Sequence, residues 1–148
     1  MTPDRVLVPD AAARGAGLSQ GIRETVAAVA ATLFTTDAGP PPPERIAWLC
    51  DDLHDFFVRA GDRARGTFRV CLAVISFAAP WFVGRLGTFR SLDESLRARA
   101  LERMERSPLA LAVFGAKAVL CFLYYEHPDA ARAAGHTQRC HVEGEVRA

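Results

Sequence analysis

The chain has 148 residues, about the length of one domain, and hydrophobic residues make up 50% of it, so a buried core can form. Its 18 basic and 17 acidic side chains leave a net charge of +1, without any basic block. This balance lacks the positive field that attracts a phosphate backbone, so we do not expect DNA or RNA as partners.

The composition changes along the chain predict three segments: a flexible N-terminal segment over residues 1–17, a single helical domain over 18–135 and a flexible C-terminal tail over 136–148. The first segment contains two prolines, and it has no basic region followed by an apolar run, so we expect no secretory signal. The four cysteines lie far apart without a Cys-x-x-Cys pair, which favours a reducing compartment. We therefore expect a cytoplasmic protein.

Helical spacing marks the first half of the domain. A first amphipathic helix carries its apolar residues at steps of three and four: Leu18, Ile22, Val26, Val29 and Leu33. Four consecutive prolines, Pro40 to Pro43, stop it and form a stiff connector. A second helix begins near Glu44 and ends at Gly61. A third, from about Phe68 to Ala79, is apolar nearly all round and ends near Pro80.

Ser91-Leu-Asp-Glu94 matches a capping box, in which the serine accepts from a first-turn amide and the glutamate reaches back to the serine amide. The helix that it opens has one apolar stripe, and Glu102 and Arg106 stand four residues apart, at the spacing of an ion pair. Ser107-Pro108 starts the next helix, which runs to about Glu126.

The helix over residues 109–126 is apolar on two opposite faces. One face carries Leu109, Val113, Ala116, Leu120 and Leu123, and the other carries Leu111, Phe114, Ala118, Phe122 and Tyr125. Such a helix is either sandwiched inside its own domain or uses one face to bind another protein. Lys117, Tyr124 and Tyr125 favour the interface, because an ammonium and amphipathic rings suit its edge.

A short last helix is predicted from His127-Pro128 to Ala134, with Gly135 as its terminator. No strand-like alternation occurs anywhere, so we expect an all-α protein, a compact bundle of about five or six helices. The two most apolar stretches, 68–84 and 109–125, fall short of the roughly 20 apolar residues that cross a membrane.

The sequence offers little for catalysis or metal binding. Asp51, Asp52 and Asp55 flank His54, but three acids on one helix are typical of a solvated face. In the tail, His136, Cys140 and His141 lie close together without the spacing of a four-ligand zinc site. We expect no catalytic residue, metal site or cofactor in this chain, and a polar tail is the simplest interpretation of those three residues.

The order of these elements resembles a known family. An early helix ending in LFTTDAGPPP, a Phe-Arg-Ser-Leu turn into a charged helix, then Ser-Pro-Leu and an apolar helix ending in YYEHPDAARAAG are similar to the gluconate 2-dehydrogenase subunit 3 family. They are also similar to the N-terminal region of long-chain alcohol oxidases and related glucose-methanol-choline flavoproteins. The resemblance is best over 89–135, about a third of the chain.

The resemblance implies a non-catalytic small subunit that binds and stabilises a large FAD-dependent oxidoreductase subunit. It carries over Leu92 and Gly135 as family positions. With His136, which stands where the family has an aromatic residue, the partner interface that it implies comprises Phe89, Phe114, Lys117, Tyr124, Tyr125, Pro128 and His136. FAD is expected in the partner, since this chain has no Gly-x-Gly-x-x-Gly motif.

The chain departs from the family in its export signal. Small subunits of this type often carry a twin-arginine export signal, and its absence here favours a cytoplasmic version. A second function stays open: a membrane-surface or structural helical protein without a flavoprotein partner, peripheral to the inner membrane. The helices lack the lysine-rich polar face that membrane-surface helices usually show.

Overall fold

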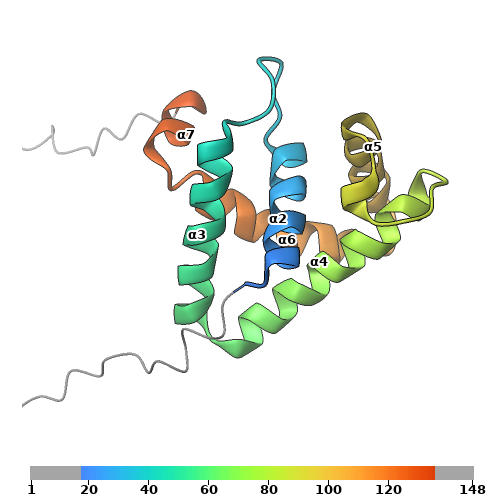
Figure 1. The fold of residues 1–148 in the computed structure, drawn as a ribbon, viewed down its shortest axis with the longest axis horizontal. Coiled ribbons are helices and arrows are strands. Elements are labelled where there is room, and N and C mark those ends of the chain that lie inside the picture. Colours follow the sequence, from blue (N-terminus) through green and yellow to red (C-terminus); the bar gives the residue numbers. More distant parts are fainter. Residues whose placement is uncertain (1–17, 136–148) are drawn as a thin grey trace, which may run out of the picture.

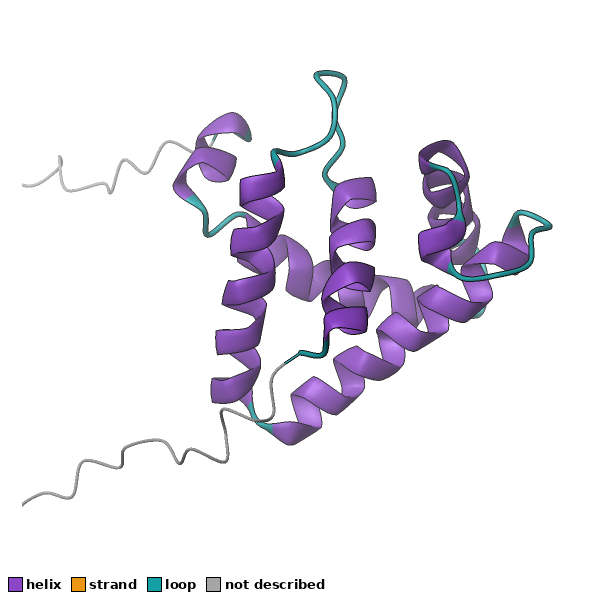
Figure 2. Ribbon diagram, in the orientation of Figure 1, coloured by secondary structure: helices purple, strands orange, loops and turns teal. Residues whose placement is uncertain are grey.

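The computed structural model describes residues 18–135, which form an all-α bundle, as predicted (Figure 1). Figure 2 shows that helices and the loops between them account for this whole range. The predicted segments 1–17 and 136–148 lie outside the described residues. The elements are α2 (Gln20–Leu33), α3 (Pro43–Ala60), α4 (Asp62–Phe82), the 3-10 helix η1 (Phe89–Ser91), α5 (Glu94–Glu105), α6 (Ala110–Tyr124) and α7 (Pro128–Ala133).

The helices pack around a shared apolar core. Figure 1 shows α2 and α3 as an antiparallel pair, with α4 leaving the end of α3 at an angle and α6 passing behind them. Five helices contribute fully buried side chains to this core: Val26, Val29, Leu49, Leu53, Ile75, Met104 and Leu120. Burial of these apolar side chains is the main stabilising contribution to the fold.

Local chemistry explains where the first helices begin and end. Ser19 caps α2, and its Oγ accepts a hydrogen bond from the Ile22 amide over 3.4 Å. Pro43 occupies the first turn of α3, where a missing amide proton costs nothing. Gly61 has a φ of +88°, so the chain turns sharply there from α3 into α4.

The third helix is longer than predicted. α4 begins at Asp62 instead of near Phe68, and it passes through Pro80 to end at Phe82. Its first turns are polar, so the spacing of apolar residues does not reveal them. Pro80 is tolerated because it lies in the last turn, where it removes one hydrogen bond and the amides of Val83 and Arg85 still bond to its carbonyl.

The predicted capping box at Ser91 is wrong. Ser91 belongs to η1, and its Oγ accepts from the Thr88 amide at 3.1 Å and donates to the Thr88 carbonyl at 2.7 Å. α5 instead starts after Asp93, whose side chain makes no capping hydrogen bond. Leu92 and Asp93 are both extended and separate η1 from α5, and the Leu92 side chain is buried in the core. The predicted pair of Glu102 and Arg106 is confirmed, at 2.8 Å.

The predicted start of α6 at Ser107-Pro108 lies two residues too early. α6 begins at Ala110 with Leu109 as its N-cap residue, no side chain caps it, and Ser107 Oγ accepts from the Leu109 amide at 3.1 Å in the turn before it. The predicted start and stop of α7 are confirmed. His127 caps α7 through Nδ1, which accepts from the Asp129 amide at 3.2 Å. Gly135, with a φ of +82°, follows the end of α7.

Candidate partner interface

α6 has one buried face and one exposed face. Val113, Ala116, Leu120 and Leu123 are buried in the core. The opposite side chains are exposed, to 83% for Leu111, 49% for Phe114, 61% for Phe122 and 44% for Tyr125. Within the described part of the chain, α6 is therefore not sandwiched, and its second apolar face is left uncovered.

α4 carries a second exposed apolar stripe. Val70, Phe77 and Trp81 follow one another at helical spacing and are 63%, 65% and 77% exposed. The opposite side of the helix supplies Phe68, Leu72, Ile75 and Ala79 to the core. Both α4 and α6 thus present large apolar side chains to solvent while the other side of each helix anchors it.

α4, which carries one stripe, packs against α6, which carries the other. Within this contact a Cβ placed on Gly115 would lie 3.2 Å from Cys71 Sγ. Val70 and Phe114 are the chain neighbours of these two residues, so one residue of each stripe lies beside the contact. We call this surface the α4/α6 apolar face, and its large side chains are Val70, Phe77, Trp81, Leu111, Phe114, Phe122 and Tyr125.

Charge is nearly absent from the parts of α4 and α6 that carry the exposed stripes. No charged residue occurs from Val70 to Gly84, and Lys117 is the one charged residue of α6. Its Nζ lies 3.0 Å from Glu105 Oε1, so this ammonium ties α6 to α5. Lys117 borders the apolar face with its charge already paired, and it needs no partner carboxylate.

Phe89, expected at the interface, is a core residue instead. Its side chain is fully buried in η1. The Arg97 guanidinium lies 5.8 Å from the centre of its ring, and Arg97 Nε donates to the Phe89 carbonyl over 3.2 Å. Phe89 therefore holds the turn between α4 and α5 in place, and its ring is not available to a partner.

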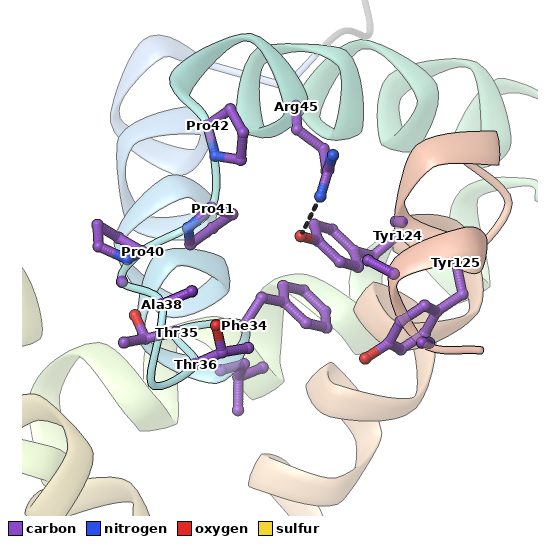
Figure 3. A pocket seen from close by; sticks show the side chains of 15 residues that line it. Phe34, Thr35, Thr36, Ala38, Pro40, Pro41, Pro42, Arg45, Tyr124 and Tyr125 are labelled. Carbon is purple, nitrogen blue, oxygen red and sulfur yellow. Dashed lines mark hydrogen bonds between the residues drawn. The ribbon is translucent and has the colours of Figure 1, made fainter.

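Tyr124 was also expected at the interface, but it is buried in the protein and only 5% of it is exposed. Its ring stacks on Phe34 with centroids 3.7 Å apart, and Arg45 Nη1 donates to its hydroxyl over 3.3 Å (Figure 3). Tyr125, its neighbour, is half-exposed and packs edge-on against the same pair. Pro128 is exposed at the start of α7.

The other candidate residues form no metal-binding cluster within the described range. Among residues 18–135, no three His, Cys, Asp or Glu side chains are close enough to hold a metal ion. Asp51 is ion-paired with Arg23 across α3 and α2, and this contact raises the pKa of the guanidinium. His136, Cys140 and His141 lie outside the described residues.

Two thiols are held in the neutral form by their surroundings. Burial raises the pKa of Cys50, which lies in the core, against a smaller opposing effect of Arg23. Burial also raises the pKa of Cys121, against a smaller opposing effect of Lys117. Neither thiol has the lowered pKa that marks a nucleophile.

Sequence reasoning missed the α4 half of the apolar face. Val70, Phe77 and Trp81 repeat at helical spacing, and this signal is visible in the sequence. It was hidden because the opposite side of α4 is equally apolar, and spacing does not tell which of two apolar faces meets the core. On α6, the sequence identified both apolar faces, and their different exposure in the structure shows which one faces the core.

No single helix of residues 18–135 is both long and apolar enough to cross a membrane. Taken together, α5 and α6 meet the length and composition criteria, but the pair is bent by 116° at its junction. The comparisons with known proteins were negative: no family model, curated protein or solved structure matches the chain.

Proposed function

We propose that this chain is a non-catalytic small subunit that binds and stabilises a flavin-dependent large subunit of the glucose-methanol-choline type, a dehydrogenase or an oxidase. The α4/α6 apolar face is the surface that makes this contact. FAD belongs to the large subunit, and the complex is cytoplasmic. The exposed second face of α6 is the observation that carries the proposal, and the sequence resemblance names the partner.

The physical argument rests on the size of the exposed side chains. Scattered surface leucines are ordinary, but four exposed aromatic side chains on two helices that pack together, Phe77, Trp81, Phe114 and Phe122, are typical of an interaction site. Each square ångström of apolar surface removed from water contributes about 25 cal/mol, and aromatic residues are the usual anchors of protein interfaces. Covering this face would therefore stabilise both subunits.

The fold also suits the face to docking. Each exposed stripe lies on a helix whose opposite side is fixed in the core, through Ile75 on α4 and Leu120 on α6. The anchors are therefore held in place before the partner arrives, which lowers the entropy that binding must lose. A subunit of this kind acts by covering an apolar surface of the large subunit and favouring its folded form.

Co-expression with a candidate large subunit tests the proposal. A glucose-methanol-choline flavoprotein encoded beside the chain is the partner to use, and flavin absorbance together with the identified subunit reports the complex. Truncating a central anchor, as in Phe77→Ala or Phe122→Ala, should weaken binding by about 2 kcal/mol, roughly thirtyfold. Val58→Ala, an exposed apolar position on α3 outside the face, is the matched control.

Thermal melting separates interface from core. The two phenylalanine variants should melt like the wild type, whereas Leu120→Ala should lose roughly 2 to 5 kcal/mol of stability through transfer and cavity terms. If Phe77→Ala and Phe122→Ala retain the flavoprotein at full affinity, the proposed interface is wrong. If they instead lose binding to lipid vesicles, and no flavoprotein complex forms, the face serves a membrane surface.

A further inference from the structure

A pocket of about 330 Å³ opens where the proline-rich α2–α3 loop meets the C-terminal end of α6 and α7. Figure 3 shows Pro40, Pro41 and Pro42 on one side of it and Tyr124 and Tyr125 on the other, with Phe34 between them. Alanines of α7 complete the lining. The pocket shares only Tyr125 with the α4/α6 apolar face, so it needs a separate explanation.

Arg45 is the one charged side chain among the described residues that line this pocket. Figure 3 shows it pointing from α3 across the pocket toward Tyr124, to whose hydroxyl its Nη1 donates over 3.3 Å. The same guanidinium lies 5.8 Å from the Tyr124 ring centre. A guanidinium carries five N–H donors, and the tyrosine hydroxyl takes one of them.

No carboxylate of residues 18–135 pairs with Arg45. The arginines in these ion pairs include Arg23 and Arg90, each bonded to an acid on another element. Arg45 is half-buried and lies in a pocket lined otherwise by apolar, threonine and tyrosine side chains. A positive charge in such surroundings favours an anion, and a planar guanidinium fork matches a carboxylate best.

The side chains that form the walls of the pocket restrict the shape of the ligand. The Phe34 and Tyr124 rings are stacked at an angle of 5°, and Tyr125 stands edge-on to Phe34 at 86°. Proline rings form the opposite wall. Flat apolar walls bind a flat apolar body, and a volume of about 330 Å³ lies at the small end of ligand pockets.

We propose that this pocket binds a small organic carboxylate with a planar apolar body, its carboxylate on the Arg45 guanidinium and its body between the proline wall and the tyrosines. This site is independent of the proposed large subunit. Benzoate is the simplest probe of the class. Benzamide keeps its shape without the charge, and inorganic phosphate keeps a charge without the body.

Titration of the full-length protein with these three compounds, followed by ligand-detected NMR, tests the inference. Benzoate should bind at millimolar concentration or tighter, and benzamide and phosphate each at least tenfold more weakly. Arg45→Gln should reduce benzoate affinity by roughly tenfold or more, since it removes the charge-assisted pair. Arg59→Gln, on the same helix and outside the pocket, should leave affinity unchanged.

A second variant tests the pocket without changing Arg45, in case Arg45→Gln does not fold. Ala134 lines the pocket from an exposed position, so Ala134→Leu should narrow it while the protein melts normally, and benzoate binding should fall with it. The inference is overturned if benzoate does not bind, if benzamide or phosphate binds equally well, or if Arg45→Gln binds benzoate like the wild type.

Discussion

Tyr124 and Tyr125 are neighbours in the chain, but they contribute differently to the stability of the fold. Tyr124 is 5% exposed and stacked on Phe34, whereas Tyr125 is 44% exposed. We expect Tyr124→Ala to lower the free energy of unfolding by about 3 to 5 kcal/mol and Tyr125→Ala by about 1 kcal/mol or less. Urea unfolding of both variants gives the comparison.

Tyr124→Phe is the control for that pair. It keeps the stacked ring and removes the hydroxyl that accepts from Arg45, so the expected loss is about 1 kcal/mol or less. Equal destabilisation by Tyr124→Ala and Tyr125→Ala would mean that the stack on Phe34 contributes little to stability.

The thiol of Cys50 should resist alkylation. Burial raises its pKa in the folded protein, so at mildly alkaline pH less of it is thiolate than in the unfolded chain. The folded state then holds its proton more tightly, and stability falls as the pH rises above the ordinary thiol pKa. Peptide mapping after iodoacetamide treatment, with and without denaturant, measures the protection. Labelling of Cys50 at the same rate in both states would contradict it.

At the scale of elements, the contact between α4 and α6 depends on a glycine. A Cβ on Gly115 would lie 3.2 Å from Cys71 Sγ, whereas a Cβ on Gly66, within α4, would meet nothing within 4 Å. Replacing a helix-interior glycine by alanine stabilises by roughly 0.5 to 1 kcal/mol where space allows. We expect that gain for Gly66→Ala and a smaller gain, or a loss, for Gly115→Ala.

The double variant Gly115→Ala/Cys71→Ala isolates the contact. Removing Sγ gives the new methyl group room, so the two substitutions should be less destabilising together than the sum of their separate effects. Chemical denaturation of the four proteins in the cycle measures the coupling. Strict additivity would show that α4 and α6 relax apart at no cost.

Element types were predictable from sequence, while several boundaries were not. Periodicity located α2, α3 and α6, because a strip of buried apolar residues dictates the helical register. The start of α4 at Asp62 was missed because its first turns are polar. The capping box at Ser91 failed because Thr88, three residues earlier, competes for the same side chain.

At the scale of the whole molecule, exposure is the property that sequence could not supply. Spacing identified both apolar faces of α6 but could not tell whether the second one is covered. α6 buries the face that meets α3, α4 and α5, and this choice depends on tertiary packing between segments far apart in the chain. For the same reason the family resemblance assigned Phe89 to the interface, although its side chain is fully buried in the fold.

An uncovered apolar face should make the isolated chain self-associate. We expect Phe77→Lys/Phe122→Lys to reduce the sedimentation coefficient at high concentration and the binding of an apolar fluorescent dye. Both side chains are mostly solvated, so each substitution should change stability by no more than about 0.5 kcal/mol.

The matched control is Val58→Lys/Leu86→Lys, which adds the same charge at exposed apolar positions outside the α4/α6 apolar face. It should leave dye binding and self-association near the wild-type level. Equal effects of the two double variants would mean that net charge, and not this face, governs association. Early unfolding of Phe77→Lys/Phe122→Lys would mean that the face is part of the core, because a lysine is tolerated at a position only where its ammonium reaches water.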